Sequence, residues 1–204
     1  MRKLRHAILK ELRNRQRAKK ADNLRQLEDR REDISDFKVR FATEADIPAL
    51  AEVHARAWAD TYPESKHPPT AELRASQWRE LFAKGGDHWF LLVVEGPSGH
   101  LVGFLKGQRF AADELPGYTG EINKIYLLRE YQRLGLGRRM MGAAVRQFLE
   151  MGIGSMVLFG VPENPSGDFH EAMGGEKLLN KRGKFDGGYG WRDLTTFESD
   201  LRSI

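Results

Sequence analysis

The feature that most constrains the fold of this 204-residue chain is a strand, a glycine turn and a helix that follow one another between residues 121 and 151. Residues 121–128 form a strand-like run. After the turn, apolar residues recur at the spacing of an amphipathic helix: Met140, Met141, Ala144, Val145, Phe148 and Leu149. A strand that enters a helix in this way predicts a sheet with helices packed on its faces.

The turn, residues 132–139, reads Gln-Arg-Leu-Gly-Leu-Gly-Arg-Arg. Its two glycines let the backbone approach a ligand closely. The first N–H groups of a helix have no internal partner and the helix dipole favours anions, so a diphosphate is the expected guest. Arg138 and Arg139 are expected to add positive charge at the rim. On its own the turn is a weak signal, because a plain strand-to-helix connection uses the same residues.

Other phosphate-binding motifs do not match the turn. A dinucleotide fingerprint requires a third glycine where Met140 stands, and an acidic residue about twenty positions on, where the sequence has Leu158. The Gly-Lys-Ser/Thr ending of a P-loop is absent. The turn therefore predicts a phosphate site of another class.

From residue 37 onward the chain alternates strand and helix patterns. Thr43 and Asp46 form a capping-box pattern before a helix, and Gly96-Pro97-Ser98-Gly99 predicts a hairpin turn. The expected strands are 37–41, 89–95, 101–110, 121–128, 155–161 and a stretch near 189–197; the expected helices are 47–58, 73–81, 135–151 and 166–173. The fold class is therefore α/β (mixed α+β), with helices on the faces of one sheet.

Several segments together resemble the GNAT acetyltransferase superfamily. Gln132-x-x-Gly135-x-Gly137 after the strand Ile125-Tyr126-Leu127 is similar to its pyrophosphate-binding signature. Residues 164–174, Asn-Pro-Ser-Gly-Asp-Phe-His-Glu-Ala-Met-Gly, resemble its Asn-Pro-Ala-x-x-Phe-Tyr-Glu-x-x-Gly element. Residues 40–46 and 189–194 are also similar to its members, so the resemblance covers residues 38 to 197 and leaves the N-terminal arm outside.

The resemblance implies a GNAT-like splayed, mostly antiparallel sheet of six or seven strands, with acetyl-CoA as acyl donor in the V-shaped gap. Backbone amides would hold its pantetheine and diphosphate. The cofactor-binding residues implied are Leu127, Gln132, Arg133, Leu134, Gly135, Leu136, Gly137, Arg138, Arg139 and Asn164. The amine would attack the thioester directly in a ternary complex, and the absence of cysteine excludes a cysteinyl acyl-enzyme.

Glu121 is the predicted general base, because an amine with a pKa near ~10.4 arrives protonated. Glu121 lies eleven residues before Gln132, where family members often carry a glutamate that works through water. Strand alternation places Asn123 on the same face, where it would order that water, and places Tyr126 on the opposite face, in the core. The alternative is that Glu121 is only a solvated carboxylate at the strand end.

His170 stands where the family usually has a tyrosine that protonates the departing thiolate. An imidazole, with a pKa near ~6.5, is a stronger acid than a tyrosine and is the predicted general acid; the alternative is a hydrogen-bonding spectator. Trp58, Tyr62 and His54 would line the acceptor cleft, where Trp58 and Tyr62 offer aromatic faces to the substrate. The alternative is that Trp58 and His54 lie on the core face of a helix. No histidine pair has metal-ligand spacing, so no metal is expected.

The leading prediction is transfer of an acetyl group from acetyl-CoA to a primary amine of a small molecule. One alternative is an acyl-CoA-binding module without turnover, which docks to a partner or RNA through its basic arm. Another is a protein or peptide N-acetyltransferase. Acceptor loops vary freely on one fold, so the acceptor cannot be read from the sequence.

Residues 1–36 form a separate basic arm before the catalytic domain, 37–204. The arm carries twelve Lys or Arg against seven Asp or Glu and has no Gly or Pro, which predicts one long or two short helices with a stripe that includes Leu4, Ile8 and Leu12. We prefer a helix packed on its own domain or on a homodimer partner to one that binds nucleic acid or anionic lipid. No apolar run approaches the ~20 residues of a membrane span, so a cytoplasmic location is expected.

Overall fold

The computed structural model describes residues 2–111, 115–162, 164 and 166–202. Seven strands form one sheet in the order β1-β2-β3-β4-β5-β7-β6, and every neighbouring pair is antiparallel except β4 and β5. The strands are β1 Lys38–Phe41, β2 Trp89–Glu95, β3 Leu101–Arg109, β4 Gly120–Leu127, β5 Met156–Phe159, β6 Glu176–Leu179 and β7 Phe185–Trp191. The predicted mixed, mostly antiparallel sheet is confirmed.

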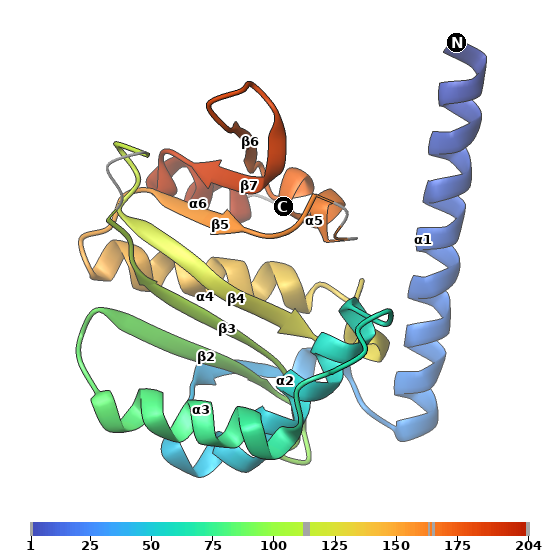
Figure 1. Ribbon diagram of the computed structural model, residues 1–204. Helices are drawn as coiled ribbons and strands as arrows, with labels where there is room; N and C mark the ends of the chain where they lie inside the picture. Colours follow the sequence, from blue (N-terminus) through green and yellow to red (C-terminus); the bar gives the residue numbers. More distant parts are fainter. Residues whose placement is uncertain (1, 112–114, 163, 165, 203–204) are drawn as a thin grey trace.

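Helices cover both faces of the sheet (Figure 1). Two helices lie in front of the sheet in that view, and two others, one of them the C-terminal helix, lie behind it. The front helices are α2 Ile47–Thr61 and α3 Ala71–Lys84; those behind are α4 Leu136–Glu150 and α6 Leu194–Arg202; the short α5 Gly167–Ala172 follows β5. The Asp46 carboxylate accepts a hydrogen bond from the Thr43 N–H (2.8 Å), which confirms the predicted cap before α2.

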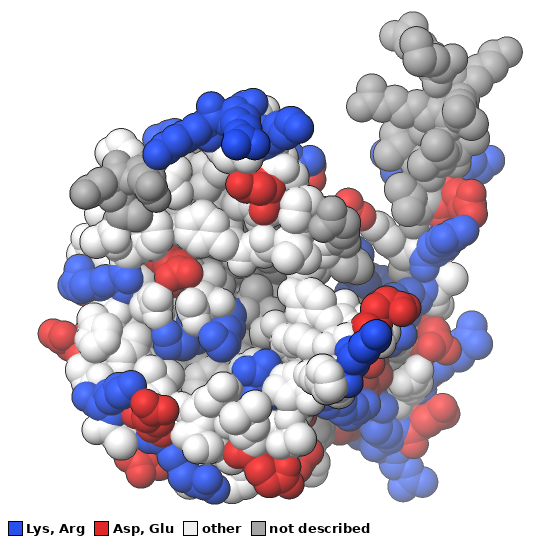
Figure 2. Space-filling view, in the orientation of Figure 1, with Lys and Arg blue, Asp and Glu red and all other residues white. Residues whose placement is uncertain are grey.

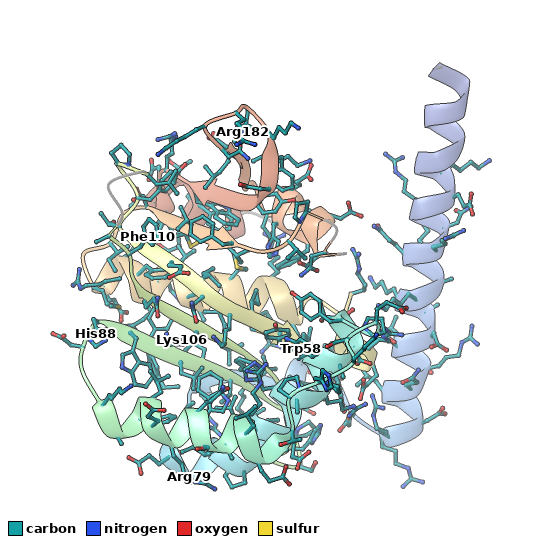
Figure 3. The ribbon with its side chains drawn as sticks, viewed as in Figure 1. Trp58, Arg79, His88, Lys106, Phe110 and Arg182 are labelled. Carbon is teal, nitrogen blue, oxygen red and sulfur yellow. The ribbon has the colours of Figure 1, made fainter. Side chains whose placement is uncertain are left out.

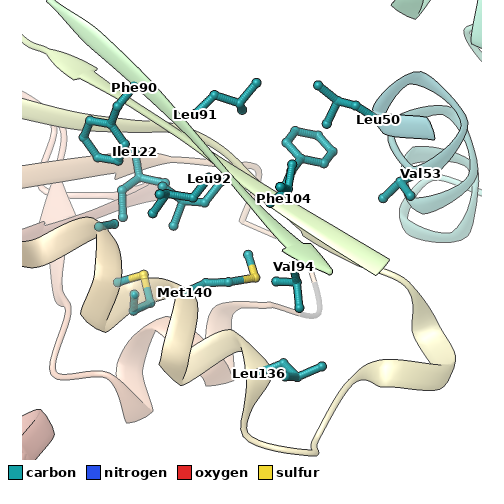
Figure 4. Packing of buried hydrophobic residues seen from close by; sticks show 14 of the residues in the cluster. Leu50, Val53, Phe90, Leu91, Leu92, Val94, Phe104, Ile122, Leu136 and Met140 are labelled. Carbon is teal, nitrogen blue, oxygen red and sulfur yellow. The ribbon is translucent and has the colours of Figure 1, made fainter. Parts of the chain in front are cut away.

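The central strands β2 and β3 are buried on both faces, as their almost continuous apolar sequences require. Phe104 of β3 is fully buried against α2, near Leu50 and Val53, whereas Leu92 and Val94 of β2 point to the opposite side, toward α4 (Figure 4). An apolar layer therefore lies on each face of the sheet, beneath the helices. A site that needs polar side chains is expected where the helices no longer cover the sheet.

An extra residue in β4 changes which side chains share a face. Ile122 pairs with Gly107 and Lys124 pairs with Lys106, so Asn123 is a β-bulge with no partner in β3. Beyond the bulge the alternation is shifted by one residue, and Tyr126 lies on the same face as Glu121. The prediction that Tyr126 faces away from Glu121 is therefore wrong.

The bulge lies where the sheet divides. The parallel pairing of β4 with β5 ends at Ile122 and Leu158, and the two strands separate beyond that point. A glycine turn and α4 follow β4 on one side of the gap, and the segment that leads into α5 follows β5 on the other. The predicted V-shaped opening thus lies between β4 and β5.

The end of the chain differs from its prediction. The strand stops at Trp191, because the Asp193 carboxylate accepts the N–H groups of Thr195 (2.9 Å) and Thr196 (3.2 Å) and begins a helix. Phe197, which the sequence placed in a strand, lies in α6 with its ring 6.1 Å from that of Trp191.

The N-terminal arm forms one helix, α1 Arg2–Arg30, which stands beside the body of the molecule (Figure 1). Its second half packs on that body through Asn23 and Leu27, each only 3% exposed, which agrees with the preferred interpretation of the arm. The side chains of the predicted stripe, Leu4, Ile8 and Leu12, lie outside the described part of the structure. No helix in the described ranges is long and apolar enough to cross a bilayer.

Candidate active site

A cleft of about 660 Å³ opens where β4 and β5 separate. One wall is β4 from Ile122 to Leu127 with the turn that follows it. The other is formed by residues 158–161, 164, 166, 167, 169 and 170. We call the part formed by Leu127 and residues 132–138 the glycine-loop end. The part at the bulge, where Asn123 lines the cleft and contacts the Glu121 carboxylate behind it, is called the carboxylate end. The two ends lie at opposite ends of one strand.

At the glycine-loop end, the backbone is shaped to present N–H groups. Gly135 has a φ of +89° and Arg133 has a φ of +64°, a conformation that is strained for a residue with a side chain. The Arg139 N–H bonds to the Gly135 carbonyl (3.1 Å), which begins the ladder of α4. The N–H groups of Leu136 and Gly137 precede that bond, so they have no partner within the helix.

The chemistry of this end fits a phosphorylated ligand. Among the described residues that line the cleft, five are Lys or Arg and only Asp60 is acidic. Lys124 belongs to the carboxylate end, and the other four cations are Lys19, Arg129, Arg133 and Arg138. A Cβ at Gly137 would lie 3.2 Å from the Phe169 ring, so the first turn of α4 is packed too closely for a large side chain. Exposed helix N–H groups inside a cationic rim form a site for an anion.

The structure does not direct every predicted cofactor-binding side chain into the cleft. Seven of them line it: Leu127, Gln132, Arg133, Gly135, Gly137, Arg138 and Asn164. The Leu136 side chain is fully buried in the core, and Leu134 packs against that core. The Arg139 guanidinium donates to the carbonyls of Ile34 (3.1 Å) and Phe37, because consecutive helix positions face different directions. The prediction that Arg139 adds charge at the rim is therefore wrong.

Asn164 shapes the opposite wall of the cleft. Its side-chain oxygen accepts the Ser166 N–H (2.9 Å), and its carbonyl accepts the Gly167 N–H (3.0 Å), so it holds the turn into α5. Pro165, part of the same predicted element, lies outside the described residues.

His170 of α5 lines the cleft and is only 3% exposed. Its Nε2 lies 3.1 Å from the Ser166 hydroxyl, and its Nδ1 is buried without a partner among the described groups. Burial lowers the pKa of His170 to about 4. The imidazole is therefore neutral at neutral pH, and its cationic form, the strong acid, is not the form present.

Glu121 lies in a polar network at the carboxylate end. Its carboxylate accepts hydrogen bonds from the side-chain amides of Gln108 (2.6 Å) and Asn123 (3.4 Å). Asn123 lines the cleft, whereas Glu121 is not among the lining residues. Asn123 therefore connects Glu121 to the cleft by a hydrogen bond. Asn123 is the bulge residue, and a bulge can direct a side chain away from the regular alternation of the strand.

The predicted acceptor residues separate into two groups. Tyr62 lines the cleft, and the half-buried Trp58 packs on it from α2, with ring centroids 4.9 Å apart (Figure 3). His54 is core: it is 2% exposed, its ring lies 4.9 Å from that of Phe104, and burial lowers its pKa to about 3.

The sequence analysis missed a group of cations beside Glu121. Lys106 of β3 is only 8% exposed and Lys124 of β4 lines the cleft, on the face that also carries Glu121. Arg74 of α3 is half-buried nearby, and the pKa of Lys124 is lowered by burial and then by the charge of Arg74. The sequence did contain a signal: Lys106 directly follows the apolar residues 101–105 in a predicted strand. A lysine in such a strand is expected to be buried, and a buried lysine needs a partner. Among the described residues no group of three or more His, Asp or Glu side chains could hold a metal ion.

Comparisons with known proteins agree with this geometry. Residues 49–174 match the model of the acetyltransferase (GNAT) family. The uncharacterized N-acetyltransferase YuaI of Bacillus subtilis strain 168 is 30% identical over 171 residues, which cover 80% of this chain and 97% of that protein.

Solved structures show the same fold at lower identity. The PaiA N-acetyltransferase of Thermoplasma acidophilum, in complex with coenzyme A, has a TM-score of 0.57 at 19% identity and covers 76% of this chain and 97% of its own. YncA of Salmonella typhimurium, with its cofactor acetyl-CoA, has a TM-score of 0.58 at 19% identity and covers 78% and 94%. By the family match over more than half of its length, this chain belongs to the GNAT acetyltransferase family.

Proposed function

We propose that the protein transfers the acetyl group of acetyl-CoA to a primary amine of a small molecule. The observation that carries this proposal is the cleft itself, which combines an anion site at the glycine-loop end with the Glu121 network at the carboxylate end. The structures of PaiA with coenzyme A and YncA with acetyl-CoA support this donor in a related fold.

In the proposed complex, the N–H groups of Leu136 and Gly137 hold the diphosphate, and Arg133 and Arg138 neutralise part of its charge. The pantetheine extends along the inner edge of β4, between Ile125 and the opposite wall at Phe169. Each strand residue advances about 3.3 Å, so β4 provides a long track from the diphosphate toward the bulge. This arrangement leads the thioester toward Asn123.

The reaction begins with removal of a proton from the bound ammonium. Glu121 accepts it through water, which the Asn123 amide beside the carboxylate would order. The amine nitrogen then attacks the thioester carbonyl, a C–N bond forms, and the C–S bond breaks to release the CoA thiolate. The nitrogen loses its second proton to the thiolate or to water, which leaves a neutral amide and CoA. No acyl-enzyme is formed, in keeping with the absence of cysteine from the chain.

We assign His170 a narrower role than the sequence predicted. A neutral imidazole does not readily give up its remaining N–H proton, but it can donate a hydrogen bond to the thiolate. A thiol with a pKa near ~8.5 is a fair leaving group with that help alone. His170 is therefore a hydrogen-bond donor to the departing sulfur rather than a general acid.

The proposal is tested by incubating the protein with acetyl-CoA and a panel of amines, with free CoA measured by thiol reagent and products by mass spectrometry. The panel contains polyamines, amino acids, aminoglycosides and short peptides. We expect CoA release that depends on one class of small amine, with a mass gain of one acetyl group. Binding of acetyl-CoA without release for any amine would contradict the proposal and favour a module without turnover. Acetylation of peptides alone would favour a protein acceptor.

A further inference from the structure

Helix α1 places a cation at the glycine-loop end, although it lies outside the segment that matches the family. Lys19 is half-buried and lines the cleft, and its Nζ donates to the Gln132 side-chain oxygen at 2.9 Å. The Gln132 amide in turn donates to the Leu127 carbonyl (2.9 Å). Lys19 is thus connected to the end of β4 where the glycine turn begins.

The position of Lys19 is fixed by contacts one turn further along α1. The buried Asn23 amide donates to the carbonyls of Arg129 (3.1 Å) and Gln132 (2.8 Å), and Leu27 is buried beside them. Lys19, Asn23 and Leu27 are spaced by four residues, so they share one face of the helix. Two buried side chains on that face hold Lys19 against the turn.

The charges around Lys19 are mostly positive, which favours the binding of an anion. The pKa of Lys19 is lowered by burial and then by the positive charges of Arg129 and Arg133. Asp60 is the acidic residue among the described groups that line this cleft. A second cavity of about 540 Å³ beside α1 shares Lys19 and Arg133 among its lining residues. Asp168 and Glu171 also line the second cavity, so the excess of cations lies in the first one, where a bound polyanion would stabilise them.

We propose that Lys19 binds the phosphate groups of CoA, so that α1 completes the donor site of this protein. This assignment rests on the proposed function, because it requires CoA as the ligand. It gives the N-terminal arm a role in the catalytic domain that the family match does not include.

The test compares Lys19→Gln with Lys20→Gln, a matched change at the exposed neighbouring position. Dissociation constants are measured by calorimetry for CoA and for pantetheine, which lacks the phosphates, and circular dichroism checks that α1 is retained. We expect CoA to bind Lys19→Gln about tenfold more weakly, the effect of one charge-assisted hydrogen bond. Pantetheine affinity and the Lys20→Gln variant should be unchanged.

Two results would overturn the assignment: a CoA affinity of Lys19→Gln within twofold of wild type, or an equal loss for pantetheine. The second would show that Lys19 acts by positioning Gln132. If the wild-type protein itself binds no CoA, the proposed function fails instead, so the two failures are distinguishable.

A second inference comes from the cations at the carboxylate end. Lys106 donates to Gln108, and the Lys124 Nζ donates to the Asn123 side-chain oxygen (2.9 Å), so both lysines join the Glu121 network. Figure 2 shows Lys and Arg side chains gathered in a hollow of this face, and Figure 3 places Lys106 there, over the sheet.

This network has more positive than negative charge. Lys106, Lys124 and Arg74 form no ion pair within 4.0 Å among the described residues, and Glu121 is the acidic group whose charge acts on the two lysines. Burial lowers the pKa of all three cations. Buried and half-buried cations with too few anionic partners lower the stability of a fold, unless a ligand supplies the missing negative charge.

We infer that the acceptor carries a carboxylate several bonds from its amine, bound by Lys124 with Lys106 and Arg74 beside it. This inference also rests on the proposed function. It is tested with acceptor pairs in which the amine is separated by several methylenes from either a carboxylate or its methyl amide. The separation keeps the amine basicity matched within each pair.

We expect wild-type kcat/KM to favour the carboxylate by about tenfold or more, and Lys124→Met to reduce this ratio toward one. Lys84→Met, at an exposed position of α3, is the control and should keep the ratio. Equal use of the carboxylate and the amide by the wild-type protein would overturn the inference, as would an unchanged ratio in Lys124→Met. Failure of every amine to be acetylated would instead refute the proposed function.

Discussion

The two ends of the cleft are built in different ways. The glycine-loop end is formed mainly by backbone, since Gly135 and Arg133 have positive φ and the first turn of α4 presents its N–H groups. The carboxylate end is formed by side chains from two strands, Gln108 of β3 and Glu121 and Asn123 of β4.

Under the proposed function, this difference separates the residues that bind the donor from those that carry out the reaction. A backbone site depends on conformation, so most side chains in the turn can vary without loss of the anion site. A side-chain network depends on each hydrogen bond and charge, so one substitution alters it. Changes at the two ends should therefore affect different measured quantities.

The largest expected effect is at the carboxylate end. Glu121→Gln keeps the shape and an oxygen that accepts the hydrogen bond from Gln108, but it removes the proton acceptor. We expect kcat to fall by about 10²- to 10⁴-fold, with the dissociation constant of acetyl-CoA unchanged. Rapid-mixing assays of CoA release and calorimetry measure the two quantities. An equal loss of CoA affinity would show that the two ends are not separate.

Two buried histidines, His54 in α2 and His170 in the cleft, should both make the stability of the fold depend on pH. Their pKa values, about 3 and about 4, lie below the unfolded value near ~6.5, so the unfolded chain binds more protons in the interval. Stability is therefore full above pH 6.5 and is lost as the pH falls toward 4.

Each histidine should contribute roughly 2 kcal/mol to the fall in the free energy of unfolding between about pH 6.5 and pH 4.5. Urea denaturation at each pH measures it, and His170→Gln should show a smaller fall than wild type. The exposed His88→Gln serves as control (Figure 3). A pH profile identical in wild type and His170→Gln would refute this account of His170.

A smaller effect is expected at the glycine-loop end. Gly135→Ala places a Cβ on a residue with a φ of +89°. This conformation costs a non-glycine residue about 1–3 kcal/mol, so we expect the turn to change conformation to relieve the strain. CoA affinity should fall about tenfold while acceptor KM stays constant. Gly154→Ala, where φ is not positive and a Cβ meets nothing within 4 Å, is the matched control. Unchanged CoA affinity in Gly135→Ala would argue against a backbone-built site.

The smallest effect is expected at Tyr62, which lines the cleft between the two ends. Tyr62→Ala removes an aromatic face worth about 0.5–1.5 kcal/mol, so acceptor KM should rise severalfold. Tyr62→Phe should retain the wild-type KM, and neither change should alter CoA affinity. A rise in CoA dissociation constant without a change in acceptor KM would assign Tyr62 to the donor instead.

The contrast also explains how much of the site the sequence could predict. The turn at Gln132–Gly137 was predictable because glycine spacing and helix periodicity determine local backbone geometry. The bulge at Asn123 was not, because one extra residue leaves no mark in the alternation of a short strand. Its consequence was the wrong face for Tyr126.

Side-chain clusters between distant segments were also beyond prediction. Lys106, Lys124 and Arg74 come from two strands and a helix, and only the fold brings their charges together. Lys19 lies 113 residues before Gln132, its hydrogen-bond partner. Most strands and helices were predictable from periodicity, but α6 was not, because its start depends on Asp193 acting as a helix cap.

The central claim is that acceptor and acetyl-CoA occupy the two ends of one cleft together and react directly. Initial rates measured while both substrates are varied test it most directly. The account predicts intersecting double-reciprocal lines and no acetylated protein by intact mass after incubation with acetyl-CoA alone. Parallel lines together with a stable acetyl-enzyme would contradict it, because they indicate a ping-pong route through a covalent intermediate.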